Sequence, residues 1–248
     1  MLLSNRSINK NVPIPLYYQL KEIILDEIKK GNLMPEDPIP TEKELSEVFE
    51  ISRTTIRQAI TELVKDGYLY RVKGKGTFIA KPKINQDFIK KLETFNEQIR
   101  RAGLTPSTKV LEFTVVEATE EIALALQIPM HEKVIKLCRL RFADKEPIVI
   151  VKTYLPYNLC SSVLQHDMEK ESLYQVLSKN LETKIYKVSR TVEAIIAGQH
   201  ESELLQIKKG YPIQFFKTIG YNQMGRPIEY SIARYRGDRN SFTVEVFV

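Results

Sequence analysis

The stretch SRTTIRQAITELVKDGYLYRVKGKGTFI, residues 52–79, decides how the first part of this chain folds. Ser52 is a favourable N-cap for a helix, because its hydroxyl can accept a bond from an unpaired amide of the first turn. Gly67 suits the end of that helix, and two short strand-like runs around a Lys-Gly-Lys-Gly tip predict a hairpin. A basic capped helix followed by a basic hairpin is the reading half of a winged helix-turn-helix, so the segment indicates DNA binding.

Upstream, the sequence predicts the two other helices that such a domain requires. Apolar residues at helical period predict a helix over residues 16–30. After a proline-rich loop, Thr41 and Glu44 form a capping-box pattern that opens a second helix. Residues 50 and 51 form the turn before the basic helix, which completes a helix-turn-helix.

Side chains of the basic helix and of the hairpin are predicted to contact DNA. Arg53 and Arg57 can form bidentate contacts with guanine, while neighbouring threonines can touch phosphate or thymine methyl groups. Glycines at the hairpin tip let the backbone approach phosphates, and the adjacent lysines supply cations. Each feature alone is typical of an ordinary helix or turn, but their order within about 40 residues favours DNA. The predicted DNA-binding residues are Thr41, Lys43, Ser52, Arg53, Thr54, Thr55, Arg57, Lys73, Gly74, Lys75, Gly76 and Thr77.

The charge distribution favours the same segment. The 248 residues include 37 Lys and Arg and 31 Asp and Glu, a formal net charge of +6. Residues 51–83 carry 8 basic and 2 acidic side chains, whereas residues 1–50 carry 6 and 9, and residues 84–248 carry 23 and 20. A solvated charge run is the weaker interpretation, because glycines and turn residues interleave these charges.

Composition argues against several other classes of protein. Cys138 and Cys160 lack metal-ligand spacing, and two thiols make no disulfide framework in a chain of this size. The longest apolar runs fall short of the roughly 18 residues of a membrane span, and the N-terminal MLLSNRSINK lacks the apolar core of a signal peptide. The sequence therefore predicts a cytoplasmic protein that uses no membrane, cofactor or metal.

The rest of the chain predicts a second domain, which gives an α+β protein with a mostly antiparallel sheet. A linker is expected at residues 81–90 between a winged helix-turn-helix over 11–80 and this second domain over 91–248. A helix stapled by Phe88, Leu92, Phe95 and Ile99 is expected to begin this domain and to close at Gly103. Strands are predicted near 108–117, 133–142, 147–155, 184–197, 212–222, 227–236 and 241–247, and helices near 119–127, 158–165, 172–180 and 199–206.

Two long runs carry a resemblance to a known family. PIPLYYQLKEIILDEIKKG and PTEKELSEVFEISRTTIRQAITELVKDGYLYRVKGKGTFIAKP, within residues 13–82, resemble the GntR-type winged-helix repressors of the HutC branch. KLETFNEQIRRAGLTPSTKV, KVIKLCRLRF and RPIEYSIARYRGDRNSF resemble the UTRA effector domain of that branch, which shares the fold of chorismate lyase. The resemblance therefore implies that residues 91–248 bind an effector and form the dimer. The resemblance implies a homodimer on a two-fold operator, released by a small metabolite that is often a phosphorylated sugar. Within the branch, the chain is similar to amino-sugar-responsive repressors.

The chain departs from the family pattern at four positions. Glu36 and Glu50 stand where glycine is usual, so a residue with a Cβ must accept each turn. Lys43 replaces an arginine, which removes a possible bidentate contact. Val151 stands where the amino-sugar regulators carry a glutamate that binds the sugar, which weakens an amino-sugar assignment.

A phosphate site is predicted at Arg139 and Arg141, which are two apart on one strand and so share a face. The alternative is a pair of solvated surface arginines. Ser172 is expected to cap a helix whose free amides can bind an anion, or to be an ordinary N-cap. The resemblance places both elements around one pocket, with Glu229 and Tyr235 near the ligand's hydroxyls and the helix around Asn96 closing the site. The predicted effector-binding residues are Thr94, Phe95, Arg139, Arg141, Ser172, Tyr174, Glu229 and Tyr235.

Together these features predict a transcriptional regulator, of the repressor type usual in the family, controlled by a phosphorylated metabolite such as a sugar phosphate. The first alternative is an enzyme of lyase-like fold, but the three histidines are scattered and neither a Gly-rich phosphate loop nor a nucleophile elbow is found. The others are a regulator with a non-phosphorylated acid effector and a metal-sensing regulator with a helical effector domain. The expected partners are double-stranded DNA, a small effector and a second copy of the chain.

Overall fold

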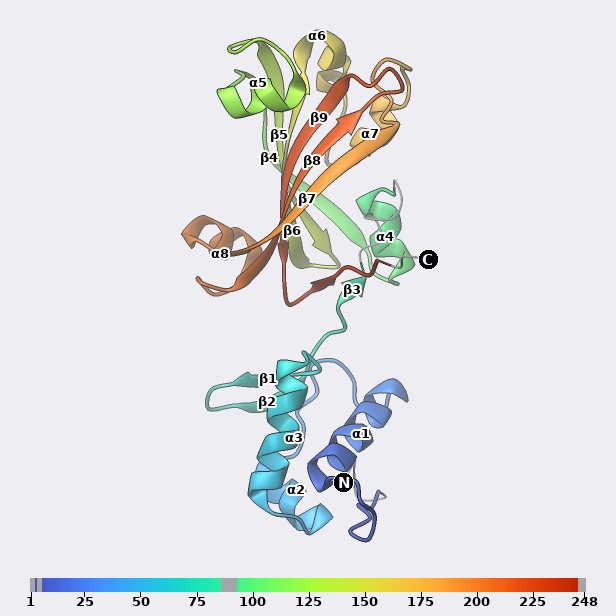
Figure 1. The fold of residues 1–248 in the computed structure, drawn as a ribbon, viewed down its shortest axis with the longest axis vertical. Coiled ribbons are helices and arrows are strands. Elements are labelled where there is room, and N and C mark those ends of the chain that lie inside the picture. The colour runs from blue at the N-terminus through green and yellow to red at the C-terminus, as the bar shows by residue number, and fades with distance from the viewer. Residues whose placement is uncertain (1–2, 4–5, 86–92, 245–248) are drawn as a thin grey trace. The chain divides into compact units, whose positions relative to one another are not determined.

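The computed structural model describes residues 3, 6–85 and 93–244. The chain divides into two compact units, Met1–Pro82 and Lys83–Val248, and each has its own hydrophobic core (Figure 1). No helix within the described ranges is long and apolar enough to cross a membrane.

The first unit is a three-helix domain with a wing. Its elements follow the predicted order, and they are α1 (Leu16–Lys29), α2 (Glu42–Phe49), α3 (Arg53–Lys65), β1 (Leu69–Val72) and β2 (Gly76–Ile79). The capping box of Thr41 and Glu44 is present, and the Ser52 hydroxyl accepts a hydrogen bond from the Thr55 amide. The core joins the apolar faces of all three helices, with Leu20, Leu45 and Ile60 at most 1% exposed. The winged helix-turn-helix prediction is confirmed.

Two turns of this unit hold glutamates in the left-handed region of backbone space. Glu36 has φ 74° and Glu50 has φ 51°, and these are the two positions where the sequence substitutes glutamate for the usual glycine. By contrast, Gly67 has φ 80° after α3, where glycine meets no steric penalty. The fold therefore accepts a Cβ at both turns and bears the strain of left-handed geometry there.

The second unit is built on a six-stranded antiparallel sheet with the strand order β4-β5-β6-β9-β8-β7. The predicted mostly antiparallel sheet is confirmed. Its strands are β4 (Pro106–Glu117), β5 (Lys133–Ala143), β6 (Glu146–Pro156), β7 (Lys187–Ile196), β8 (Pro212–Tyr221) and β9 (Pro227–Arg236). Its helical segments are α4 (Phe95–Arg101), α5 (Glu120–Leu126), α6 (Tyr157–Cys160), the 3-10 helix η2 (Ser161–Gln165), α7 (Leu173–Leu177) and α8 (Gln199–Leu205).

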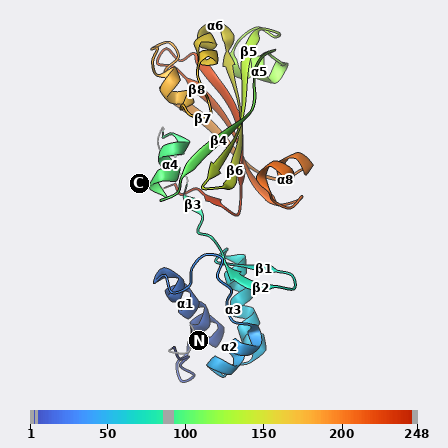
Figure 2. The same ribbon diagram turned by 180° about the vertical axis from the view of Figure 1, so that it is seen from behind.

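Helices cover both faces of this sheet (Figures 1 and 2). On one face, α5 and α8 pack against side chains such as Val134 and Leu140 of β5. On the other face, α4, α6 and α7 pack against residues of opposite parity, including Leu137. Arg139 and Arg141 share that parity, so the sheet directs them beneath α4 and α7.

Some predicted elements differ from the structure. The helix expected over 158–165 is divided into α6 and the 3-10 helix η2, and the helix expected over 172–180 is only the five-residue α7. Of the strand expected over 241–247, the described residues up to 244 include only Ser241 in a strand, as part of the two-residue β10 (Asn240–Ser241), which pairs in parallel with β3 (Ile84–Asn85). Phe88, Leu92 and residues 245–248 lie outside the described residues.

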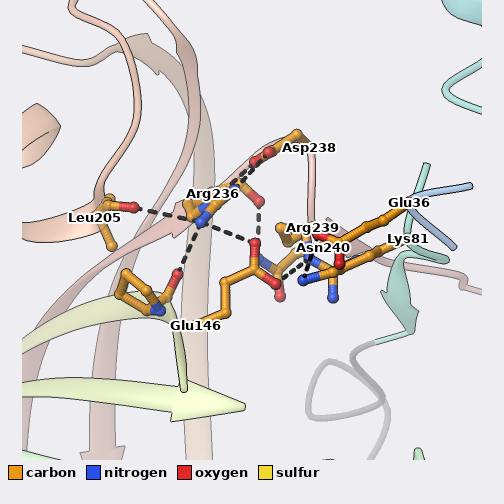
Figure 3. Close-up of polar contacts among 9 residues, drawn as sticks. Glu36, Lys81, Glu146, Leu205, Arg236, Asp238, Arg239 and Asn240 are labelled. Atoms are coloured by element: carbon orange, nitrogen blue, oxygen red, sulfur yellow. Dashed lines mark hydrogen bonds and ion pairs between the residues drawn. The ribbon is translucent and has the colours of Figure 1, made fainter. Parts of the chain in front are cut away.

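A buried ionic cluster fixes the chain where β9 ends (Figure 3). Arg236 donates to both carboxylate oxygens of Asp238 and lies 3.1 Å from the Glu146 carboxylate. The same carboxylate is 3.0 Å from the Arg239 guanidinium, and the Asn240 side chain donates to the Arg236 carbonyl. These bonds anchor β10 to the end of β9.

Candidate nucleic-acid interface and ligand pocket

The N-terminal turn of α3 presents cations and hydroxyls to solvent. Arg53 and Thr54 are exposed. Arg57 is exposed as well, but its Nε and Nη2 atoms donate to the Glu42 carboxylate at 3.1 and 2.9 Å. The Thr55 hydroxyl lies 2.8 Å from the Ser52 hydroxyl. Arg53 and Thr54 can therefore reach a DNA groove directly. Arg57 can do so only if it leaves the Glu42 carboxylate or contacts DNA while still bonded to it.

The wing presents a tight cationic tip. Gly74 and Gly76 have φ 77° and 124°, and a Cβ at either position would meet nothing within 4 Å. Their conformations, not close packing, therefore require glycine. Lys73 and Lys75 are exposed beside them. Arg71 donates to the Thr61 hydroxyl at 3.0 Å, which ties the wing to α3.

The other predicted DNA-binding residues have structural bonds in the ligand-free chain. The Thr41 hydroxyl and amide both donate to Glu44, so Thr41 is engaged in the cap of α2. Lys43 is exposed, 3.9 Å from Glu47. The Thr77 carbonyl accepts a bond from the Ile39 amide, which holds the wing against the loop before α2. These contacts orient the helix-turn-helix and the wing, and any contact that these residues make with DNA is a prediction.

All eight predicted effector residues line one cavity beneath α4 and α7. Strand pairing explains much of this convergence. Arg139 pairs with Val151, which pairs with Ala233, which pairs with Phe216 across four strands. Arg141 and Tyr235 lie in a neighbouring row on the same face, joined through Val149, and Glu229 lies on the other side of the Arg139 row. The cavity is lined by Thr94, Phe95, Gln98, Arg139, Arg141, Val151, Ser172, Leu173, Tyr174, Arg190, Phe216, Thr218, Glu229, Ser231, Ala233 and Tyr235.

Of the two arginines of β5, Arg139 is buried and Arg141 is half-buried, and both have incomplete hydrogen bonding. Arg139 is 4% exposed, so the alternative of a solvated surface pair is wrong. Arg141 lies over the Phe95 ring at 4.4 Å and donates to Asn96 at 3.4 Å. Within the described part of the chain, the Nε atoms of both arginines are buried without a hydrogen-bond partner. Donors left in this state are suited to an anion that enters from outside.

Burial weakens the protonated form of both guanidinium groups. Desolvation lowers the pKa of Arg139 from its ordinary value, although the nearby Glu229 carboxylate opposes the shift. Desolvation, followed by the charge of Arg139, lowers the pKa of Arg141 to about 9. A bound anion would compensate both effects, because an opposite charge favours the charged form.

The part of the cavity near Glu229 is also polar, but it contains a carboxyl group beside its hydroxyl groups. The Tyr174 hydroxyl donates to the Glu229 carboxylate at 2.7 Å. Burial raises the pKa of Glu229, and burial together with Glu229 raises the pKa of Tyr174 well above its ordinary value. Ser231 and Thr218 add hydroxyls between this pair and the arginines. The cavity thus has Arg139 and Arg141 at one end, and hydroxyl and carboxyl groups at the other end together with Arg190, which pairs with Thr218.

Sequence reasoning missed several lining residues. Ser231 and Ala233 could have been found, because they alternate with Glu229 and Tyr235 along one strand and so share their face. Arg190 and Thr218 could not, since they reach the cavity only through the pairing of β7, β8 and β9. Ser172 does line the cavity, but its side chain makes no capping bond to α7, so the expected side-chain cap is wrong.

The winged domain and the cavity beneath α4 and α7 define a class of protein, the ligand-responsive DNA-binding regulators. A profile for the gntR family of bacterial regulatory proteins matches residues 16–79, and the UTRA domain profile matches residues 101–241. The chain belongs to the GntR family and carries a UTRA domain. It is therefore a DNA-binding transcriptional repressor that responds to an effector, and not an enzyme.

Similar proteins cover nearly the whole chain. The HTH-type transcriptional repressor NagR of Bacillus subtilis (strain 168) is 36% identical over 95% of this chain and 96% of its own length. The mannosyl-D-glycerate transport/metabolism system repressor MngR of Escherichia coli (strain K12) is 30% identical over 93% and 95%. The crystal structure of PhnF from Mycobacterium smegmatis superposes with a TM-score of 0.67 at 28% identity, covering 90% of this chain and 97% of that one.

Proposed function

We propose that the effector is a phosphorylated metabolite, such as a sugar phosphate, whose anionic group binds between Arg139 and Arg141. The observation that carries this proposal is the pair of buried Nε atoms of Arg139 and Arg141, which have no hydrogen-bond partner in the described residues. Uncompensated buried charge is costly unless a ligand pairs with it. Two planar donors on one face also suit the three oxygens of a phosphate group.

The remainder of the ligand would lie toward β8 and β9. Thr218, Ser231 and Glu229 offer hydroxyl and carboxyl partners for the hydroxyl groups of a sugar. Val151 forms an apolar part of the wall beside Arg139 and offers no counter-charge for an amino group there. Beside Arg139, the wall therefore suits a neutral part of a sugar better than an amino group.

In this proposal, the winged unit binds a two-fold operator as part of a cytoplasmic homodimer. Arg53 and Arg57 read bases, while Lys73 and Lys75 contact phosphates. The exposed first turn of α3 and the glycine-rich wing tip support these roles.

The effector would control DNA binding through the first segment of the second unit. Phe95, Phe216 and Tyr235 line the cavity and also share an apolar cluster with Ile84 of β3. Because β3 begins two residues after the winged unit ends, a ligand that rearranges these rings also acts on the segment that follows that unit. We expect a shift in population between DNA-competent and released states.

A ligand screen tests the effector assignment. The melting temperature of the full chain is measured in the presence of hexose phosphates, hexosamine phosphates, the matching unphosphorylated sugars and non-phosphorylated sugar acids. The proposal requires that a sugar phosphate raises the melting temperature and weakens operator binding, while its unphosphorylated sugar does neither. If a non-phosphorylated acid is as effective as any phosphate, the alternative effector class is correct. The name of MngR refers to mannosyl-D-glycerate, a non-phosphorylated sugar acid, which is the reason to include sugar acids in the screen.

A pair of substitutions tests the DNA interface. Arg53→Ala should reduce operator affinity by about 1–3 kcal/mol and relax the preference for one base pair. Lys75→Ala should weaken binding to all sequences alike and reduce the slope of affinity against salt by about one unit. Mobility shifts across salt concentrations and mutated operators measure both. Unchanged binding in both variants would exclude this interface.

A further inference from the structure

Gln98 of α4 carries a buried acceptor that no described group of the protein satisfies. Its side chain lines the effector cavity and is 3% exposed. Its Nε2 atom donates to the Glu93 carbonyl at 3.2 Å, whereas its Oε1 atom is buried and has no hydrogen-bond partner among the described residues. A buried amide oxygen without a donor is costly, so a ligand that supplies a donor in the cavity would relieve this cost.

The surroundings of Gln98 fix the orientation of its amide. A backbone carbonyl can only accept, so the bond to Glu93 identifies the Nε2 side of the amide and leaves Oε1 on the other side. Glu93 is itself held in place, because its carboxylate oxygens accept from Arg101 Nη1 at 2.5 and 2.6 Å. Gln98 cannot turn its amide over without losing the bond to Glu93, so Oε1 remains the unpaired atom.

Gln98 lies at the same end of the cavity as the two arginines of β5. Phe95 and Gln98 are three positions apart on α4 and therefore share one face of this helix. The Phe95 ring in turn lies 4.4 Å from the Arg141 guanidinium. The nearby Thr94 hydroxyl is already engaged, since it donates to the Glu97 carboxylate and accepts from the Glu97 amide. Gln98 therefore adds an unpaired acceptor next to a pair of donors.

We propose that Gln98 accepts a hydrogen bond from a hydroxyl group of the effector, close to the anionic group that Arg139 and Arg141 bind. This inference rests on the proposed function and adds a feature of the ligand to it: a phosphate ester with a free hydroxyl near the esterified carbon. A hydroxyl suits this place better than an ammonium group, because the two arginines already supply positive charge there. A site that hydrogen-bonds a ligand hydroxyl discriminates against analogues that lack it.

Removal of the acceptor tests this role in the full-length protein. The probe is the hexose phosphate that raises the melting temperature of the parent most in the ligand screen. Gln98→Met has a similar length but no acceptor, so it should raise the dissociation constant of this probe about three- to tenfold. Gln98→Leu lacks the acceptor as well and should have the same effect. Calorimetric titration measures both variants and the parent.

Gln214→Met is the matched control. The Gln214 amide also donates to a backbone carbonyl, that of Asn240, at 3.4 Å, and its Oε1 atom is also buried without a partner among the described residues. Gln214 is not among the residues that line the cavity. The control therefore removes the same bond and the same unpaired oxygen elsewhere, and should leave the dissociation constant of the probe within about twofold of the parent.

Deoxy analogues of the probe identify the hydroxyl that Gln98 binds. Each analogue replaces one hydroxyl with hydrogen and so removes one donor. One of them should bind the parent about three- to tenfold more weakly than the probe does, but should bind Gln98→Met within about twofold of the probe, because that bond is already missing. Sulfate, which carries no proton donor at neutral pH, should stabilise the parent and Gln98→Met equally, since it occupies the arginines alone.

The outcomes separate this inference from the effector class on which it rests. If a hexose phosphate binds the parent and both Gln98 variants equally, the proposed function stands and the role of Gln98 is wrong. If only unphosphorylated compounds bind the parent and the Gln98 variants weaken them, the phosphate assignment fails and Gln98 keeps its role. If Gln214→Met weakens binding as much as Gln98→Met, the loss reflects packing and the role is wrong. If no compound of the screen binds the parent, both proposals fail.

Discussion

At the residue scale, Arg141 shows how a binding function can oppose stability. Its Nε atom is buried near Arg139 and has no hydrogen-bond partner among the described residues. Replacing an uncompensated buried charge with an apolar side chain of similar length often stabilises a protein. The effector site is therefore expected to reduce the stability of the ligand-free chain.

Arg141→Met should raise the free energy of unfolding of the ligand-free protein by about 1–4 kcal/mol and abolish stabilisation by a phosphorylated effector. Arg100→Met, at an exposed position on α4, is the control and should alter neither quantity. Chemical denaturation with and without ligand measures both. A destabilised Arg141→Met variant that still binds the ligand would contradict this account.

The pH dependence follows from the lowered pKa of Arg141, which is about 9 in the folded chain and ordinary in the unfolded one. Between these values the unfolded chain binds more protons, so this group makes the folded state more stable as the pH rises above about 9. Binding of an anion should weaken over the same range, because the deprotonated group no longer attracts it. Isothermal titrations from pH 7.5 to about 10 should show affinity falling in the parent protein.

Backbone strain at Glu50 gives a second test at this scale. Its φ of 51° is unfavourable for a residue with a Cβ, so Glu50→Gly should raise the free energy of unfolding of the first unit by up to about 1 kcal/mol. Gly67→Ala is the reciprocal change at φ 80° and should lower it by about 1 kcal/mol. Thermal denaturation measures both, and a shift in the same direction for the two variants would contradict the strain argument.

At the element scale, two helices begin with the same motif but serve different sites. Thr94 and Glu97 form a complete capping box at the start of α4, as Thr41 and Glu44 do at the start of α2. The cap of α4 fixes the turn that carries Phe95 into the effector cavity. The cap of α2 fixes the helix-turn-helix.

Thr94→Ala and Thr41→Ala should therefore have similar costs in stability, about 1 kcal/mol each, but different effects on function. Thr94→Ala should weaken effector binding several-fold, because α4 no longer holds Phe95 and Asn96 against Arg141. Thr41→Ala should leave effector affinity unchanged. Calorimetric titration of both variants decides this, and equal effector affinities would show that the cap of α4 does not position the site.

At the scale of the whole molecule, the ionic cluster at the end of β9 links the cavity to the start of the second unit. Tyr235 lines the cavity, Arg236 follows it in the cluster, and the Arg239 carbonyl accepts the bond from the Ile84 amide of β3. Glu146 forms ion pairs with both Arg236 and Arg239, and so connects the residue next to Tyr235 with the residue that bonds β3.

Glu146→Gln should leave effector affinity within about twofold of the parent and reduce the effect of saturating effector on operator affinity. Faster hydrogen exchange at the Ile84 amide should accompany this loss of coupling. The control is Glu112→Gln, which breaks the ion pair between Glu112 of the edge strand β4 and Lys136 of β5. If hydrogen exchange at the Ile84 amide becomes faster but the effector still changes operator affinity as much as in the parent, the ionic cluster does not couple the cavity to β3.

The sequence by itself determined the first unit almost completely. Its signals are local, since a cap, a helical period and a glycine act within a few residues of one another, and Ser52, the capping box at Thr41 and the wing turn all lie where the sequence predicts them. Alternation along single strands also placed Arg139 with Arg141, and Glu229 with Tyr235, on one side of the sheet.

The tertiary structure decided which strands are neighbours and therefore which side chains meet. Pairing of β5 with β6, β9 and β8 sets Arg139 in a row with Val151, Ala233 and Phe216, although these residues are far apart in sequence. The burial that lowers the pKa of both arginines depends on α4 and α7 covering this face. The position of β7 at one end of the sheet is likewise a property of the strand order, which no local pattern encodes.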